Sequence, residues 1–200
     1  MLKKARVAVF VSGGGTNLQA LLDADMPSCE ISLVVSRNPQ AYALERARLA
    51  GIPCAAIPGT LSAFEEKALE ILRAHGIHIV VLAGFLTILS PAFIRRYENR
   101  ILNIHPALIP AFSGKGYYGL KVHEAALARG VKVTGATVHI VNEQPDGGPI
   151  LCQKAVEVRE GDTPESLQRR VMEQAEWVLL PKAVEAACRQ FIKESDPCVR

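Results

Sequence analysis

The chain has 200 residues, of which 49% are hydrophobic and 22% are charged, and both values are ordinary for a globular protein. A chain of this length buries enough surface to fold as one domain without disulfides or metals. The net charge of +3 is not gathered into a basic run, so it argues against nucleic-acid binding and fits an anionic small ligand.

The cysteines and the N-terminal segment favour a soluble cytoplasmic protein. The five cysteines are odd in number and none forms a C-x-x-C pair, so we expect reduced thiols. The first apolar run has the length of a strand and leads into a glycine turn rather than a cleavage site, so we expect no signal peptide. No apolar stretch reaches the roughly 18–20 residues that a membrane span needs.

The first half of the chain alternates apolar, β-branched runs with amphipathic segments, which predicts buried strands separated by helices. The expected strands are 6–11, 30–35, 53–57, 77–83 and 101–104. The expected helices are 18–24, 41–50, 64–75 and 91–97. We expect Thr16 or Asn17 to cap the first helix and Ser90 the fourth. This alternation predicts a Rossmann-like α/β fold, a mostly parallel sheet with helices on both faces.

The second half has a different organisation. A long irregular loop precedes a short helix that Gly130 ends, and two strands joined by a polar loop predict an antiparallel pair added to the sheet. A long helical stretch follows, with an expected kink at Pro181. The ranges are 106–118 for the first loop, 120–128 for its helix, 132–141 and 150–158 for the strands, 142–149 for their connection, 164–193 for the helical stretch, and 194–200 for a flexible tail. We find no linker or repeat, so one domain over residues 1–200 is expected.

A glycine-rich turn follows the first expected strand and opens a helix. It consists of Ser12, Gly13, Gly14, Gly15, Thr16 and Asn17. Glycines let the backbone approach an anion, and the free amides of a helix start point at it, so we favour a monophosphate site over a plain tight turn. The turn matches neither the dinucleotide pattern G-x-G-x-x-G nor a P-loop, which disfavours both of those ligands.

Asn103 and His105 lie two residues apart at the end of the fifth expected strand and therefore project to the same face. An amide donor beside an imidazole can stabilise an oxyanion and move a proton. Taken alone, this pair is as compatible with a structural role as with catalysis. Pro106 and Pro110 add rigidity to the loop that follows, which favours the catalytic interpretation.

Asp146 lies in the loop 144–149, which carries an Asp-Gly turn signal. Either it is an ordinary turn residue or it is a carboxylate that faces His105, and both interpretations stay open. Loops in such folds gather at the carboxyl ends of the strands, where ligands bind.

The other histidines are weaker candidates. We expect His75 and His78 to be solvated and His139 to support the core or the site, while His123 has no specific signal. Cysteines and histidines lack metal-ligand spacing, and no serine or cysteine lies in a nucleophile elbow, so neither metal nor covalent catalysis is expected. A phosphate loop beside an Asn, His and Asp cluster suits direct transfer of an activated acyl group to an amine.

Six segments in order resemble the phosphoribosylglycinamide formyltransferases, the folate-dependent glycinamide ribonucleotide transformylases. The resemblance runs from about Ala5 to Ala187, nearly the whole chain, and its order makes it specific. The segments are VSGGGTNLQ at 11–19, LERA at 44–47, VLAGFL at 81–86, ILSP at 88–91, LNIHP at 102–106 and DGGP at 146–149.

The resemblance implies a role for each group of site residues. It assigns catalysis to Asn103, His105 and Asp146. It assigns the substrate phosphate to Gly13, Gly14, Gly15, Thr16 and Asn17, and the ribose hydroxyls to Glu176. It assigns the folate pocket to Phe85, Leu86, Ile88 and Leu89, with the loop from Glu143 to Asp146 contacting the pterin through its backbone. Two departures from the family pattern are Thr87, which stands where some members carry arginine and receives no role, and one extra residue before Glu176.

The implied reaction moves the formyl group of 10-formyltetrahydrofolate, a co-substrate, to the amine of glycinamide ribonucleotide in purine synthesis. The amine attacks the formyl carbon directly, and a tetrahedral intermediate forms. The resemblance implies small-molecule partners only, no metal, and a monomer or homodimer.

Three other functions stay open. Methionyl-tRNA formyltransferase adds a C-terminal tRNA domain, and formyltetrahydrofolate deformylase adds an N-terminal regulatory domain, and we expect this chain to lack both. A non-catalytic nucleotide-binding module would have no use for His105 and Asp146.

Overall fold

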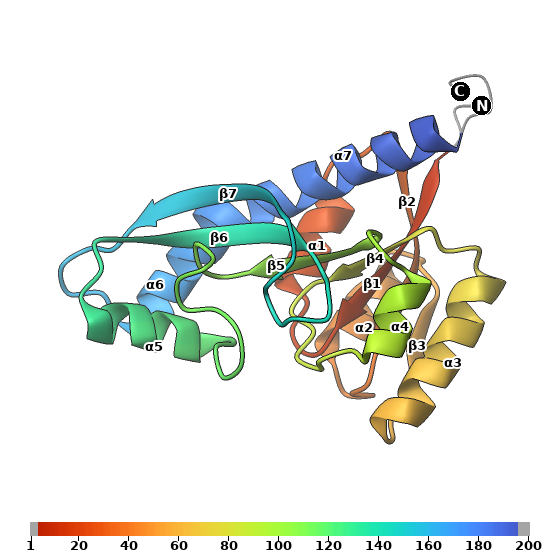
Figure 1. Cartoon of the computed structure of the whole chain (residues 1–200), viewed down its shortest axis with the longest axis horizontal. Helices are drawn as coiled ribbons and strands as arrows, with labels where there is room; N and C mark the ends of the chain where they lie inside the picture. Colours follow the sequence, from red (N-terminus) through yellow and green to blue (C-terminus); the bar gives the residue numbers. More distant parts are fainter. Residues whose placement is uncertain (1–3, 196–200) are drawn as a thin grey trace.

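The computed structural model describes residues 4–195 and contains one mixed sheet (Figure 1). Its strands are β1 (Ala5–Val11), β2 (Cys29–Ser36), β3 (Cys54–Ala56), β4 (Ile79–Leu82), β5 (Ile101–His105), β6 (Val133–Ile140) and β7 (Ile150–Glu157). They lie in the order β3-β2-β1-β4-β5-β6-β7. The pairs from β3 to β5 are parallel, while β5–β6 and β6–β7 are antiparallel. This confirms the mostly parallel sheet with an antiparallel C-terminal pair.

Helices cover both faces of this sheet. They are α1 (Thr16–Asp23), α2 (Tyr42–Leu49), α3 (Leu61–Ala74), α4 (Pro91–Arg96), α5 (Leu120–Arg129), α6 (Pro164–Val171), the π-helix η1 (Met172–Glu176) and α7 (Trp177–Glu194). Alternate residues of β1 point to opposite faces: Val7 and Val9 join a core with α1, α2 and α7, while Ala8 and Phe10 join a core with α3 and α4. Figure 1 shows α7 along the upper side of the molecule and the α3–α4 pair at its lower right. The continuous apolar strands that the sequence predicts follow from this double coverage.

The sheet order brings the informative loops together. β1 lies between β2 and β4, so the chain leaves β1 toward one edge of the sheet and later returns to its other side at β4. In open α/β sheets this reversal leaves a crevice beyond the carboxyl ends of the two strands. The loops after β1, β4 and β5 all open at that edge.

The start of α1 differs from the prediction. Its N-cap is Gly15, with a φ of 73°, and no side chain caps the helix. Thr16 and Asn17 lie inside the first turn, and their side chains contact η1 instead. The prediction for α4 is confirmed, because the Ser90 hydroxyl accepts a hydrogen bond from the Phe93 amide at 3.2 Å.

The expected kink at Pro181 stays a prediction, while the structure shows a break elsewhere in the helical stretch. The long helical stretch is interrupted earlier, by η1, and Pro181 lies in the second turn of α7, where its ring removes one backbone hydrogen bond without ending the helix. A π-turn takes in one residue more than an α-turn, which agrees with the extra residue before Glu176. Of the tail predicted from residue 194, Glu194 still belongs to α7, and 196–200 lie outside the described residues.

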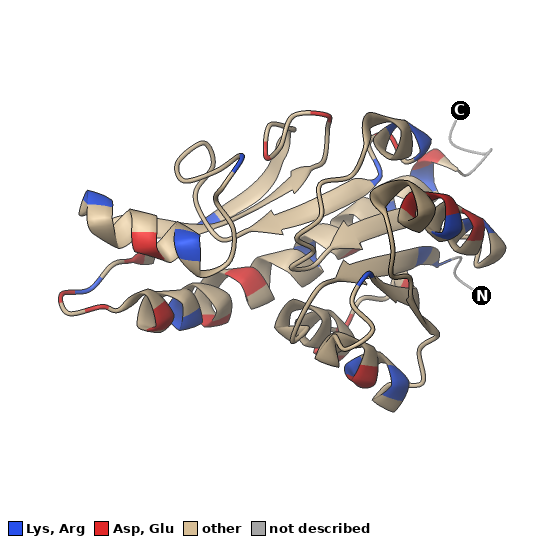
Figure 2. Ribbon diagram, turned by 90° about the horizontal axis from the view of Figure 1, so that it is seen from below, with Lys and Arg blue, Asp and Glu red and all other residues tan. Residues whose placement is uncertain are grey.

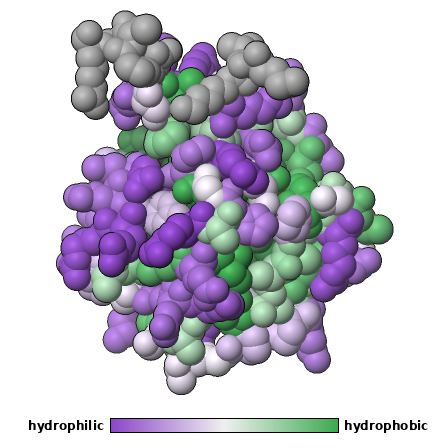
Figure 3. Space-filling view, turned by 90° about the vertical axis from the view of Figure 1, so that its right-hand side faces the viewer, coloured by the Kyte–Doolittle hydropathy of each residue, from purple (hydrophilic) through white to green (hydrophobic). Residues whose placement is uncertain are grey.

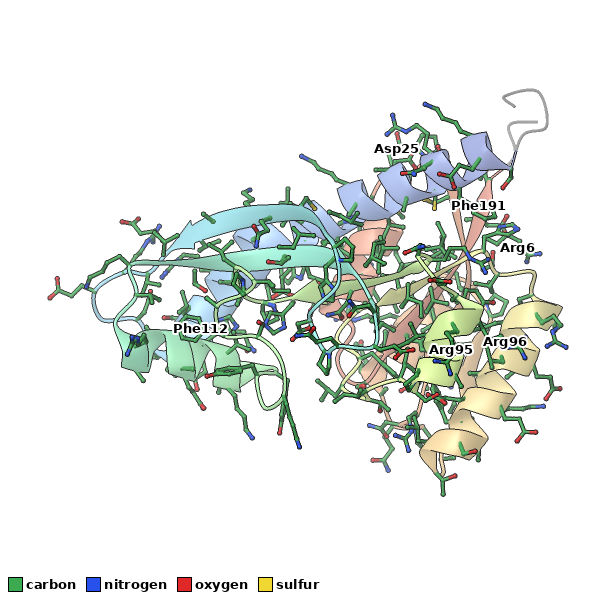
Figure 4. All side chains as sticks on the ribbon, in the orientation of Figure 1. Arg6, Asp25, Arg95, Arg96, Phe112 and Phe191 are labelled. Carbon is green, nitrogen blue, oxygen red and sulfur yellow. The ribbon has the colours of Figure 1, made fainter. Side chains whose placement is uncertain are left out.

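His78 also differs from the prediction, because it is half-buried and its ring is held by two contacts. Its Nδ1 accepts a hydrogen bond from the Arg6 amide at 2.9 Å, and its ring stacks on Phe191 with 4.7 Å between centroids (Figure 4 labels Arg6 and Phe191). His78 therefore ties the start of β1 to the end of α7. His75 is half-buried at the C-cap of α3.

Charged residues lie mainly on helices and loops, and the strands carry few of them (Figure 2). Both signs are interspersed along the helices seen in this view. The end of the molecule seen in Figure 3 mixes hydrophilic and hydrophobic side chains. Within residues 4–195, no helix is both long and apolar enough to cross a membrane.

Candidate active site

A cavity of about 780 Å³ lies at the carboxyl ends of β1, β4 and β5. Loops after these strands line it, together with residues 114–119, the connection between β6 and β7, and part of η1. Every residue to which the sequence assigned a catalytic, phosphate, ribose or folate role lines this one cavity. Its volume lies within the range of small-molecule sites.

The glycine loop is held from behind by α2. The Ala43 amide donates to the Gly13 carbonyl at 3.0 Å, and a Cβ on Gly15 would lie 2.6 Å from the Cβ of Ala43. A Cβ on Gly13 or Gly14 would meet no atom within 4 Å, so these two residues face open space. The loop thus presents backbone to the cavity at the start of α1, where helix amides favour an anion.

Arg46 supports the outer side of the same loop, a role that the sequence did not indicate beyond the LERA segment. Its Nε donates to the Gly14 carbonyl at 2.8 Å, and its Nη1 donates to Gln19 Oε1 at 2.9 Å. The guanidinium fixes the loop and adds positive charge next to the anion site.

Glu176 reaches the cavity from η1 and binds the phosphate loop. Asn17 Nδ2 donates to Glu176 Oε2 at 2.7 Å, and Thr16 Oγ1 lies 3.8 Å from Met172 Sδ. Burial raises the pKa of Glu176 to about 6, although the hydrogen bond from Asn17 acts in the opposite direction. The structure therefore brings Glu176 to the predicted place and explains why Asn17 does not cap α1.

His105 is buried at the end of β5, between two acceptors. Its Nε2 lies 2.8 Å from the Phe112 carbonyl, and because a carbonyl only accepts, Nε2 carries a proton (Figure 4 labels Phe112). Its Nδ1 lies 3.5 Å from Asp146 Oδ2. Burial lowers the pKa of His105, while the Asp146 carboxylate and the Phe112 carbonyl partly offset this. A neutral His105 can thus take a proton on Nδ1, next to a carboxylate that stabilises the cation.

Asp146 combines both sequence interpretations. It is a turn residue with a φ of 54°, a conformation that aspartate tolerates better than most residues, and it faces His105. Its Oδ2 accepts from the Gly114 amide at 2.8 Å, and its Oδ1 lies 3.5 Å from His139 Nε2. Burial would raise the pKa of Asp146, but the contact with His139, the charge of His105 and the Gly114 amide together lower it. The group is therefore a carboxylate at neutral pH.

Two further histidines belong to this cluster. His139 lies opposite Asn103 in the β5–β6 pair, with 3.1 Å between its Nε2 and Asn103 Nδ2. His123, from α5, is fully buried and neither ring nitrogen has a hydrogen-bond partner among residues 4–195. Burial and the nearby His105 lower the pKa of His123 to about 4, so its imidazole is neutral. The strand position of His139 was a usable signal, whereas His123 had none.

The predicted folate wall divides into two parts. Phe85 and Leu89 are buried, and Phe85 stacks on Phe64 with 5.7 Å between centroids. Leu86 and Ile88 are each 62% exposed, although both line the cavity. The wall therefore offers an anchored apolar surface at the cavity mouth, of the kind that binds aromatic rings.

The carboxylate of Glu143 is already paired. It binds Arg95 on α4 at 2.7 Å, and both side chains are largely exposed (Figure 4 labels Arg95). This pair connects the β6–β7 loop to α4. The backbone of the loop, rather than the Glu143 carboxylate, is then available to a ligand.

Among residues 4–195, no group of three or more His, Cys, Asp or Glu side chains could hold a metal ion. In the same part, Cys29, Cys54, Cys152 and Cys188 are free thiols.

Comparison with known proteins agrees with this geometry. The family model described as formyl transferase matches residues 5–184. The chloroplastic phosphoribosylglycinamide formyltransferase of Arabidopsis thaliana is 40% identical over 199 residues, which are 96% of this chain and 68% of that protein. The trifunctional purine biosynthetic protein adenosine-3 of Bos taurus is 44% identical over 92% of this chain, but the chain spans only 18% of its length.

Solved structures give the same result. Glycinamide ribonucleotide transformylase 1 from Symbiobacterium toebii is 40% identical with a TM-score of 0.86, covering 94% of this chain and 89% of that one. A formyltetrahydrofolate deformylase from Pseudomonas syringae is 30% identical with a TM-score of 0.83, covering 94% of this chain and 62% of that one. The predicted resemblance is confirmed: the chain belongs to the formyl transferase family.

Proposed function

We propose that this chain transfers the formyl group of 10-formyltetrahydrofolate to the amine of glycinamide ribonucleotide, a step of purine synthesis. The observation that carries this proposal is a single cavity lined both by a phosphate-type glycine loop and by the Asn103, His105 and Asp146 cluster. A hydrolase that acts on the folate alone would need the cluster but not the glycine loop. Relatives named for glycinamide ribonucleotide support the same substrate.

Each end of the cavity then has a role. The backbone of Gly13–Asn17 binds the phosphate of the ribonucleotide, and Glu176 accepts hydrogen bonds from its ribose hydroxyls. Phe85, Leu86, Ile88 and Leu89 contact the folate, and the backbone of the loop at Glu143 contacts its pterin. The amine of one substrate and the formyl group of the other meet near Asn103 and His105.

The reaction follows from these positions. The amine nitrogen attacks the formyl carbon, and the carbonyl electron pair moves to oxygen. Asn103 donates to this oxyanion, and His105 adds a positive charge beside it once Nδ1 is protonated. The C–N10 bond then breaks, the amine loses a proton and N10 gains one. His105 carries that proton on Nδ1, where Asp146 stabilises the cation and orders a water.

An absorbance assay of folate deformylation, run with and without glycinamide ribonucleotide, tests the proposal. Turnover only with the ribonucleotide is the expected result. Turnover without it would identify a deformylase, the function of the Pseudomonas syringae neighbour. A folded protein without turnover in either assay would overturn both.

The cytoplasmic location, the single domain, the monomer or homodimer, and the absence of metal and nucleic acid stay predictions. The plant relative is named as chloroplastic, so the family does not fix the compartment.

A further inference from the structure

Gln153 lies on β7, the strand at one edge of the sheet, and its side chain is exposed (Figure 1). Its Nε2 donates to the Ile109 carbonyl at 3.0 Å and to Thr137 Oγ1, also at 3.0 Å. Because a carbonyl only accepts, the nitrogen end of this amide faces Ile109, and both of its hydrogens are used. Gln153 therefore ties the edge of the sheet to the loop that follows β5.

Thr137 lies between Gln153 and His105 across the sheet. It is the direct partner of His105 on β5 and of Gln153 on β7, so the three side chains lie on one face. Its hydroxyl donates to the Ala107 carbonyl at 2.6 Å and accepts from the Ile109 amide at 3.1 Å. With the hydrogen bond from Gln153, its one hydrogen and both lone pairs are used, as burial of this hydroxyl requires.

These contacts hold the start of the loop after β5, and a contact with the catalytic histidine lies a short way further along it. The Ala111 amide donates to the Leu108 carbonyl at 3.0 Å, which closes a turn. Phe112 follows this turn, and its carbonyl lies 2.8 Å from His105 Nε2. The anchored backbone at Ile109 therefore leads directly to the group that accepts the hydrogen bond of His105.

The backbone of Phe112 depends on such an anchor. Its φ is 49°, in the left-handed region, where a residue that carries a Cβ is strained. A strained conformation of this kind persists only where the surrounding structure holds it. The hydrogen bonds to Ala107 and Ile109 hold the chain that leads into Phe112, and they come from Thr137 and Gln153.

The Phe112 carbonyl decides which nitrogen of neutral His105 carries the proton. While this carbonyl accepts from Nε2, Nδ1 is unprotonated and faces Asp146 Oδ2 at 3.5 Å, as the proposed base must. If the carbonyl moved away, the Asp146 carboxylate would draw the proton of the ring to Nδ1. His105 could then no longer take a proton from the amine at that nitrogen.

We propose that Gln153 is a positioning residue for His105. Together with Thr137 it holds the loop that places the Phe112 carbonyl on Nε2, and this leaves Nδ1 free to take a proton. The effect on rate rests on the proposed function, whereas the effect on the tautomer of His105 does not depend on it.

The first experiment measures the tautomer of His105 by NMR, in protein that carries ¹⁵N-labelled histidine and at a pH above the pKa of His105. The chemical shifts of the two ring nitrogens show which one is protonated, and His105→Gln assigns the signals. Wild type should carry the proton on Nε2. Gln153→Glu keeps the shape of the side chain but replaces both donors by a carboxylate, which the Ile109 carbonyl repels. It should shift a large part of the His105 population to the Nδ1–H tautomer.

The second experiment measures steady-state kinetics. Gln153→Glu should lower kcat about tenfold and leave KM for the ribonucleotide nearly unchanged, because none of these contacts involves the glycine loop. Gln153→Lys keeps N–H donors and should retain most of kcat. Lys154→Gln is the matched control, because it changes the net charge by the same amount on the opposite face of β7. It should change neither the tautomer nor kcat.

Gln153→Met, which keeps the length of the side chain but has no donor, provides an independent variant if Gln153→Glu does not fold. An unchanged tautomer in the folded variants, or a fall in kcat that Lys154→Gln shares, would overturn the inference. A wild-type Nε2–H tautomer that Gln153→Glu shifts, in a protein without any transfer activity, would refute the proposed function and leave this positioning role standing.

Discussion

Asn103 and His139 are directly opposite partners in the β5–β6 pair, and Asn103 Nδ2 lies 3.1 Å from His139 Nε2. His139 Nδ1 lies 2.9 Å from the Ile140 carbonyl, so Nδ1 donates to that carbonyl and Nε2 accepts from the Asn103 amide. This arrangement fixes which end of the Asn103 amide is the donor. One of the two amide hydrogens binds His139, and the second is free to face the cavity.

His139 is therefore a positioning residue for Asn103. Replacing it by phenylalanine keeps the ring volume and removes the acceptor, so the amide of Asn103 loses its orientation. We expect kcat to fall about tenfold, with KM for the ribonucleotide nearly unchanged. Steady-state kinetics in both substrates measures this, and His75→Gln is a control for loss of an imidazole elsewhere. An unchanged kcat in folded His139→Phe would show that Asn103 needs no such support.

Asp146 and His105 provide a second prediction, and its first part, a pKa, does not depend on the mechanism. The Asp146 carboxylate raises the pKa of His105 against the effect of burial, so Asp146→Asn should lower this pKa further. The same change should lower kcat about 100-fold or more, because the cation formed on Nδ1 loses its counter-charge. An NMR titration of the His105 ring protons, assigned with His105→Gln, measures the first effect.

The control for this experiment is Asp25→Asn, which removes one exposed carboxylate outside the cavity (Figure 4 labels Asp25). It should leave both the pKa of His105 and kcat as in wild type. A higher pKa of His105 in Asp146→Asn would contradict the ion pair inferred from the 3.5 Å separation.

The sequence predicts the sheet well because burial on both faces leaves a local signal. Continuous apolar runs mark β1 and β4, and the polar connection 142–149 marks the turn between β6 and β7. The positions of the glycine loop, Asn103 and His105 are also predictable, since each lies at the carboxyl end of a strand and these ends meet at the same edge.

What the sequence does not predict depends on contacts between distant residues. Asn17 is a good helix cap by local rules, but a carboxylate 159 residues away takes its amide. The break at η1 carries no glycine or proline that would mark it in the sequence, whereas Pro181 gives a strong local signal but lies inside a continuous helix. The pairing of Arg37 with Thr87 is likewise visible only when the loops after β2 and β4 are placed together.

Gly15 carries a prediction about the phosphate loop. Alanine there must adopt a φ of 73° and place its Cβ 2.6 Å from the Cβ of Ala43. Ala43 has no flexible side chain that could move aside, because its Cβ and Cα are both packed against this position. We expect Gly15→Ala to lower the free energy of unfolding by about 2–4 kcal/mol. Urea denaturation measures this. Gly13→Ala is the matched stability control, because its Cβ meets nothing within 4 Å, and a similar loss in both variants would refute the steric argument.

Glu176 carries the last prediction, on stability against pH. Burial raises its pKa in the folded state to about 6, from an ordinary value of 4.5. Between these values the unfolded chain releases the proton while the folded chain keeps it, so the free energy of unfolding falls as pH rises from 4.5 to 6. The full effect is about 2 kcal/mol, and it persists above pH 6. Glu176→Gln can still accept from Asn17 but does not titrate, so its stability should lack this fall and exceed that of wild type above pH 6. Urea denaturation of both proteins at several pH values gives the difference directly, because all other titrating groups are shared. Parallel stability curves would mean that Glu176 is already ionised in the folded protein throughout this range, with Asn17 outweighing the cost of burial.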